Sequence, residues 1–146
     1  MWGEEAATVD DAGFAALGIE ELSSRRLSGG VLLSGAVTVT PRQSGSARGV
    51  RVELLLDEHV PARADEPLEE DRHAITVIAT VPVAEHVDLT PGEVLRLPFT
   101  LRVPLPLPAP STSTPEFRIR WLLRAVLDRP RRSDPATTVE LFGTTA

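Results

Sequence analysis

Cysteine, tyrosine and lysine are absent from this chain of 146 residues, and aromatic residues make up only 4% of it. Without cysteine there can be no disulfide, no thiolate metal site and no cysteine nucleophile, and nothing points to an oxidising compartment. No apolar run approaches the roughly 18 residues that a membrane helix needs. The apolar fraction of 42% is nevertheless enough to build the core of one ordinary domain.

The charge balance is acidic, with a formal net charge of −6, and every basic residue is arginine. A negative domain disfavours nucleic acid as a partner, because neutralisation of phosphates supplies most of that affinity. The exclusive use of arginine is typical of a GC-rich genome and favours a bacterial source. The acidic start, Met1 to Glu5, lacks the basic and apolar blocks of a secretory signal. We therefore expect a soluble, cytoplasmic protein without a membrane span or cofactor.

The segment from Val94 to Pro130 shows the clearest periodicity. Two runs alternate between apolar and polar residues, which is the period of two that a half-buried strand requires. A helical period would instead mix arginines into the apolar stripe of the second run. The apolar faces contain Leu95, Leu97, Phe99, Leu101 and Val103 in the first run, and Phe117, Ile119, Trp121, Leu123, Ala125 and Leu127 in the second.

Further alternating segments predict strands at Ile19–Leu22, Val31–Val39, Gly49–Asp57, His73–Val81, Ala84–Leu89 and Thr138–Phe142. About seven or eight strands with turn signals between them predict an all-β, two-sheet antiparallel β-sandwich of the immunoglobulin-like kind. Its core should contain Trp121, Phe99, Phe117, Leu54 and Val37. Residues 1–18 lack this periodicity and are expected to form a mobile or weakly packed extension or a short helix capped by Asp10 and Asp11. The alternative is a leading strand or helix that docks on the sandwich or on a partner. Residues 19–146 form the single domain.

Several short motifs carry a family resemblance: Pro98-Phe99 with Leu101 and Val103-Pro104, the run Ile119 to Pro130, Leu33-Ser34-Gly35-Ala36-Val37, and Pro91-Gly92-Glu93. They resemble the arrestin-type domain of α-arrestins and of bacterial sporulation-control proteins, over roughly Ile19 to Leu141. Trp121 stands where that family usually has tyrosine. The resemblance implies a non-catalytic protein-binding module that acts as an adaptor, scaffold or regulator.

The resemblance does not extend to the functional motifs of the larger arrestins. The absence of tyrosine excludes a PPxY motif, and the absence of lysine excludes the paired lysines that sense receptor phosphates. Arrestins carry two sandwiches, whereas this chain has room for one. We expect either a single-lobe relative or one lobe of a longer protein.

Acidic residues accumulate between Asp57 and Asp71, where the apolar period is lost. We expect a flexible loop without a metal ion. The alternative is a calcium- or ligand-binding accessory domain, since clustered carboxylates can hold that ion, although no Asp-x-Asp-x-Asp spacing organises them. The histidines, His59, His73 and His86, belong to no catalytic or zinc-binding signature, so we expect no enzyme activity.

The proline-rich segment Pro104–Pro110 is expected to be a stiff crossing between sheets, and the alternative is a PxxP-like ligand. The partner-binding surface is expected on the polar phase of the strand Phe117–Leu127 and in the turn that follows. Its residues are Arg118, Arg120, Leu122, Arg124, Val126, Arg129, Arg131 and Arg132.

Arginine mixed with aliphatic side chains is typical of protein interfaces. The partner would be another protein or a second copy of the chain, whose Glu69, Glu70 or Asp71 could meet Arg129 to Arg132. The alternative is a solvated sheet face with cross-strand ion pairs to Glu53 or Glu140. Because the strand arginines lie on the polar phase, their joint replacement by glutamate is expected to leave the fold intact.

Overall fold

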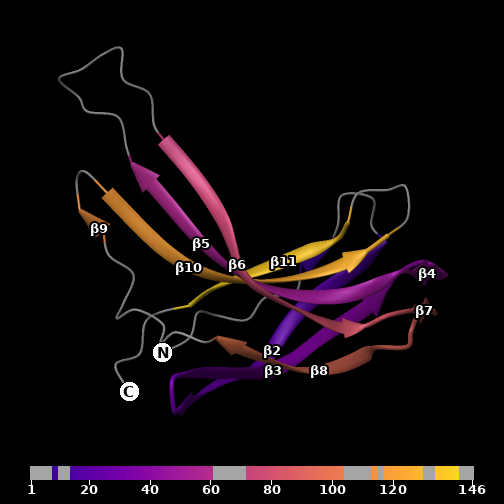
Figure 1. The fold of residues 1–146 in the computed structure, drawn as a ribbon. Coiled ribbons are helices and arrows are strands. Elements are labelled where there is room, and N and C mark those ends of the chain that lie inside the picture. Colours follow the sequence, from indigo (N-terminus) through magenta and orange to yellow (C-terminus); the bar gives the residue numbers. More distant parts are fainter. Residues whose placement is uncertain are drawn as a thin grey trace.

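The computed structural model describes residues 8–9, 14–60, 72–103, 113–114, 117–129 and 134–141, and in this part of the chain it contains strands and no helix. The strands are shown in Figure 1. Their bounds are β1 Thr8–Val9, β2 Ala15–Leu27, β3 Gly30–Pro41, β4 Gly45–Ala47, β5 Gly49–Val60, β6 Arg72–Ala84, β7 Val87–Leu89, β8 Leu95–Val103, β9 Ser113–Thr114, β10 Phe117–Asp128 and β11 Ala136–Leu141.

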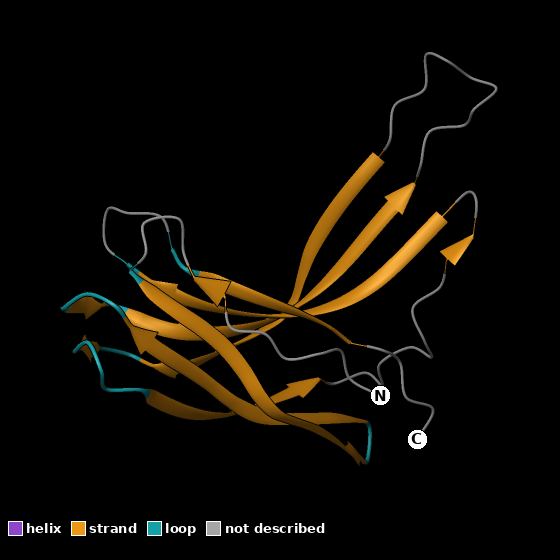
Figure 2. Cartoon of the chain, turned by 180° about the vertical axis from the view of Figure 1, so that it is seen from behind, coloured by secondary structure: helices purple, strands orange, loops and turns teal. Residues whose placement is uncertain are grey.

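Two antiparallel sheets pack face to face, which confirms the predicted β-sandwich (Figures 1 and 2). The four-stranded sheet has the order β1-β2-β3-β8. The five-stranded sheet has the order β11-β10-β5-β6, with the short β9 also paired to β10. A small separate pair, β4 with β7, lies at one end of the sandwich.

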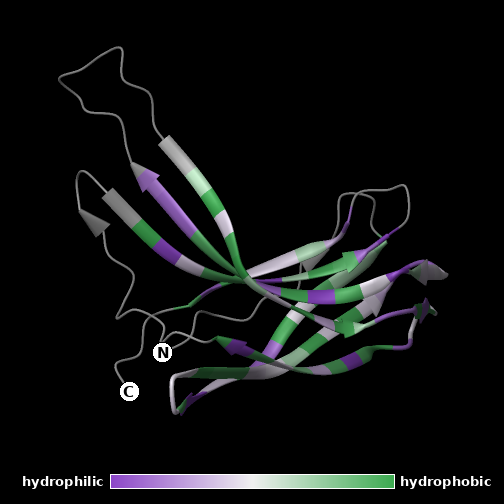
Figure 3. Cartoon of the chain, viewed as in Figure 1, coloured by the Kyte–Doolittle hydropathy of each residue, from purple (hydrophilic) through white to green (hydrophobic). Residues whose placement is uncertain are grey.

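The apolar phases of the strands meet between the sheets, as Figure 3 shows by the hydrophobic residues along both layers. Phe99, Leu54 and Val37 are buried there, as predicted. Trp121 is partly buried and packs against this core, while the side chain of Phe117 lies outside the described part. Burial of aliphatic residues, at about 25 cal/mol per Å² of apolar surface, is thus the main term that holds the layers together.

The start of β2 is a leading strand, which was the alternative to an extension or a short helix. Residues 15 to 18 belong to this strand, and Phe14, Ala15, Ala16 and Leu17 are all buried. A strand that is buried on both faces is a continuous apolar run and has no alternation. The period-two criterion therefore could not recognise it.

The five-stranded sheet is strongly curved. The far halves of β5, β6 and β10 rise away from the four-stranded sheet as a projecting arm, and the face turned away from that sheet lies on the inside of the curve (Figures 1 and 2). The pairing of β5 with β6 shifts register twice, so that Ile78 and Val83 have no opposite residue. Such bulges increase the local bend of a strand.

The acidic segment is shorter than predicted. Asp57 and Glu58 belong to β5, which runs to Val60, and β6 begins at Arg72. Asp57, the last residue of the predicted strand and the first of the predicted loop, lies inside β5, and its carboxylate is paired and buried. Residues 61–71, which carry the rest of the acidic segment, and the proline-rich residues 104–110 lie outside the described part.

Candidate functional site

The outer face of the five-stranded sheet holds the polar phase of β10. Val52, Leu54 and Leu123 point into the core with no exposed surface, so the residues that alternate with them point outward. The register sets three pairs side by side: Asp57 opposite Arg120, Leu55 opposite Leu122, and Glu53 opposite Arg124. We call these six residues, together with Arg51 and Val126, the outer face.

Arg120 binds the carboxylate of Asp57 through two hydrogen bonds. Its Nε donates to Asp57 Oδ2 at 3.0 Å and its Nη2 donates to the same oxygen at 2.6 Å. The aspartate side chain is only 2% exposed, whereas 35% of the arginine side chain remains exposed. A buried carboxylate is tolerated because charge-assisted hydrogen bonds replace its lost water.

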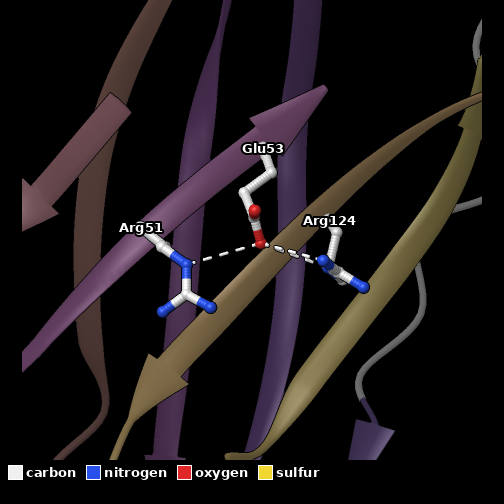
Figure 4. Close-up of polar contacts among 3 residues, drawn as sticks. All are labelled: Arg51, Glu53 and Arg124. Atoms are coloured by element: carbon white, nitrogen blue, oxygen red, sulfur yellow. Dashed lines mark hydrogen bonds and ion pairs between the residues drawn. The ribbon is translucent and has the colours of Figure 1, made fainter. Parts of the chain in front are cut away.

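Glu53 lies between two arginines, as Figure 4 shows. Arg124 donates from Nε and Nη2 to Glu53 Oε1 at 3.2 and 3.1 Å, and Arg51 Nε approaches the same oxygen at 3.4 Å. Glu53 is 8% exposed, but Arg51 and Arg124 keep 39% and 34% of their side chains in solvent. The acids are thus buried at the base of the face and the guanidinium groups form its surface.

Aliphatic residues separate the ion pairs. Leu55 and Leu122 are 2% and 8% exposed, and Val126 is 3% exposed, although all three point away from the core. Their burial follows from the inward curve of this face and from the long arginine side chains beside them. The sequence predicted Leu122 and Val126 as interface side chains, and in the isolated chain little of their surface is accessible.

Among the side chains that the structure describes, the face is nearly neutral. Three guanidinium groups, of Arg51, Arg120 and Arg124, stand against two carboxylates, and Glu140 on β11 lies opposite Leu122. The ion pairs to Glu53 that the sequence offered as an alternative are present. The arginines are therefore oriented groups on a mixed surface, and they do not make a basic patch.

These ion pairs overturn one expectation. Glutamates at positions 120 and 124 would place carboxylates against Asp57 and Glu53, which are already buried acids. Unpaired like charges in a desolvated site are strongly destabilising. The charge-reversed triple variant should therefore not retain the parent's stability.

Of the other predicted arginines, only Arg129 has a described side chain, and it does not join this face. Arg129 is buried, and its guanidinium carbon lies 3.5 Å from the ring centroid of Phe14, where it closes one end of the core. Arg118 pairs with His59 in the strand register, but its side chain lies outside the described part, as do Arg131 and Arg132.

A feature that the sequence reasoning did not single out borders the outer face. Within the described residues, three of the four large exposed hydrophobic side chains belong to β6: Ile75, Val77 and Ile78, at 53%, 47% and 43% exposed. Ile75 and Val77 lie opposite Asp57 and Leu55, so they extend the outer face to the sheet edge. The available signal was the stretch from residue 74 to 84, which contains no charged residue.

The histidines and acidic residues that were considered as catalytic or metal-binding candidates are dispersed in the described part of the chain. His86 Nε2 lies 3.1 Å from Asp88 Oδ1 in an exposed pair on the surface. No group of three or more His, Asp or Glu side chains there is placed to hold a metal ion. A depression of about 240 Å³ at the start of β5, between Arg48 and Glu85, is smaller than the 300–1,000 Å³ typical of ligand pockets.

Comparison with known proteins places the fold. No protein-family model matches the sequence, and no curated protein is significantly similar to it. Among solved structures, the chain is similar to Spo0M, a sporulation control protein from Bacillus subtilis, with a TM-score of 0.61 and 20% identity. The match covers 89% of this chain and 49% of Spo0M, so the chain spans about half the length of that protein.

The likeness is one of fold, and it agrees with the arrestin-type sandwich that the sequence motifs predict. In the part of the chain that the structure describes, no helix is long and apolar enough to span a membrane.

Proposed function

We propose that this chain is a non-catalytic protein-interaction module of bacterial origin, an adaptor, scaffold or regulator in the cytoplasm, and that it contacts its partner through the outer face. The observation that carries this proposal is the arrangement of Arg120 and Arg124. Each is held in place by a buried acid and still exposes about a third of its side chain.

Such groups lose little conformational entropy on binding, because their orientation is already fixed in the free protein. One strand away from them, across β5, the exposed Ile75 and Val77 of β6 supply apolar area at the margin of the same face. Arginine and aliphatic surface in this combination is typical of interface centres. The fold likeness to a protein named for sporulation control supports a regulatory role of the same general kind.

The near neutrality of the face indicates the chemistry of its partner. A surface with one surplus guanidinium group does not select a strongly acidic ligand. It suits a mixed apolar and polar protein surface that accepts hydrogen bonds from guanidinium groups. Binding should therefore depend only weakly on ionic strength.

The test removes the arginines without leaving a buried charge behind. The variant combines Glu53→Gln with Arg124→Gln and Asp57→Asn with Arg120→Gln, so that both cross-strand ion pairs become pairs of neutral side chains, while Arg51 keeps its contact with solvent. Crosslinking in the native cytoplasm, followed by identification of the captured proteins, compares this variant with the parent. We expect it to fold and to lose the parent's principal partner.

A matched control neutralises an ion pair elsewhere on the same sheet. Arg48 and Asp128 form an exposed pair at 3.2 Å, and Arg48→Gln with Asp128→Asn should leave capture unchanged. If the outer-face variant is folded by circular dichroism and captures the same partner at the parent's level, the outer face is not the interface.

A further inference from the structure

The free edge of the five-stranded sheet is the first half of β6, on the projecting arm. Strand order places β6 at the end of its sheet, and within the described residues it pairs only with β5. In this half, the backbone N–H and C=O groups on the side away from β5 have no described strand as a ladder partner. An edge of this kind is a template for another strand.

The protection of this edge is uneven. Natural edge strands are protected by charges, prolines or bulges. The two bulges, at Ile78 and Val83, and the proline, Pro82, all lie in the second half of β6. The first half pairs with β5 in unbroken register up to Val77, and every residue from Ala74 to Ile78 is exposed.

From these observations we propose that β6 of one chain pairs antiparallel with β6 of a second copy, about a two-fold axis at Thr76. In this register Ile75 lies opposite Val77 of the second copy, Ala74 lies opposite its Ile78, and the two Thr76 residues face each other. This inference goes beyond the outer-face proposal and does not depend on it.

The strand is complementary to itself. Antiparallel pairing would set β-branched residues directly opposite one another, which is a favourable cross-strand combination. No charged residue occurs between positions 74 and 84, so no like charges oppose each other in the paired segment. Figure 3 shows this contrast, because the coloured part of the projecting half of β6 lacks the hydrophilic colour that marks β5 beside it.

The geometry also favours a closed pair. The arm stands clear of the four-stranded sheet (Figures 1 and 2), so a second arm can approach without contact between the two sandwich bodies. A two-fold axis occupies both free edges at once and leaves no edge for a third chain. Because the contact is smaller than a standard interface, we expect a weak dimer with a dissociation constant of roughly 10–100 µM.

The primary test is a charge exchange at the axis. Thr76→Lys places two lysines opposite each other and Thr76→Glu places two glutamates, so each variant should be monomeric by sedimentation velocity at concentrations where the parent is dimeric. An equimolar mixture should form the dimer again. The control is Val94→Lys, which adds the same charge at an exposed residue outside β6. This variant should dimerise like the parent.

A second measurement uses the absence of cysteine from the chain. Directly opposed residues in antiparallel strands lie about 4.5–5.5 Å apart between Cα atoms, within the range that a disulfide accepts. Thr76→Cys should therefore form a covalent dimer under mild oxidation at least tenfold faster than Val94→Cys.

Several outcomes would overturn the proposal. These are a parent that stays monomeric at about 500 µM, a Thr76→Lys variant that dimerises as the parent does, a mixture that fails to reassociate, or equal crosslinking of the two cysteine variants. A monomeric parent would leave the edge for a strand of a different protein. Loss of the outer-face arginines should not change self-association, so this proposal and the proposed function can fail separately.

Discussion

Replacing Arg120 with leucine should lower the free energy of unfolding by about 2–4 kcal/mol. The change removes both hydrogen bonds to Asp57 Oδ2, at 3.0 and 2.6 Å, and leaves a carboxylate that is only 2% exposed. Removing one partner of a fully buried ion pair costs about 3–5 kcal/mol. The value here is lower because 35% of Arg120 is exposed, so water can enter in its place, and Asp57 has a further interaction.

The reciprocal change should cost less. Asp57→Leu frees a guanidinium group that already reaches solvent, so we expect a loss of about 1 kcal/mol. The double variant Asp57→Leu with Arg120→Leu should lie within about 1 kcal/mol of the parent, because well-packed aliphatic residues often replace a buried pair without loss. The single costs should therefore not add, with a coupling energy of about 2 kcal/mol or more.

Urea unfolding of the parent and the three variants, monitored by tryptophan fluorescence and circular dichroism, measures this cycle. The parallel cycle on the exposed pair Arg48 and Asp128 is the control and should give a coupling energy below about 1 kcal/mol. Additive costs at Asp57 and Arg120, within about 0.5 kcal/mol, would show that the two residues do not interact as described and would refute this reasoning.

Further predictions concern stability and can be checked by the same unfolding measurements. Joint replacement of Arg118, Arg120 and Arg124 by glutamate should cost more than about 4 kcal/mol, and a variant as stable as the parent would contradict the buried ion pairs. Trp121→Phe should change the free energy of unfolding by less than about 1 kcal/mol, because the buried Trp121 Nε1 has no hydrogen-bond partner in the described structure. Trp121→Ala should cost about 3 kcal/mol or more, because it removes the whole aromatic ring. Gly49→Ala should cost about 2–3 kcal/mol, since a Cβ there would lie 2.7 Å from the carbonyl oxygen of Ala84. Gly29→Ala should cost about 1 kcal/mol, because the added Cβ would meet open space but the backbone φ of Gly29 is 90°.

Much of the fold was predictable because most strands have one face in contact with solvent and one in the core. The alternation in β3, β5, β8 and β10 reports directly on which residues meet the core, and Leu54, Phe99 and Val37 are buried as predicted. The start of β2 was only the alternative expectation, because Ala15, Ala16 and Leu17 are buried on both sides of their strand and show no alternation. A local pattern carries no information on whether another layer covers the second face.

The candidate site was predictable only in part, because its properties depend on register. The sequence identified the arginines of β10 and named Glu53 as one available partner. It could not tell that Asp57, at the start of an acidic segment, lies opposite Arg120. Nor could it show that curvature buries Leu122, or that β6 lies at a sheet edge, since strand order is a long-range property.

The strand order also has a consequence for how the chain folds. β3 finds its outer neighbour, β8, only when Val31 meets Val103, and β5 is completed on its second side only by β10. Contacts between segments this distant slow folding, because the loop must close before any pairing stabilises it. On the ribosome, β3 and β5 therefore remain open edges until the later strands emerge, and during that time β6 is one of several exposed templates. We expect refolding on the scale of milliseconds to seconds. The yield of refolded protein should fall as the protein concentration rises, because strands of different molecules can pair before β8 and β10 close the sheets.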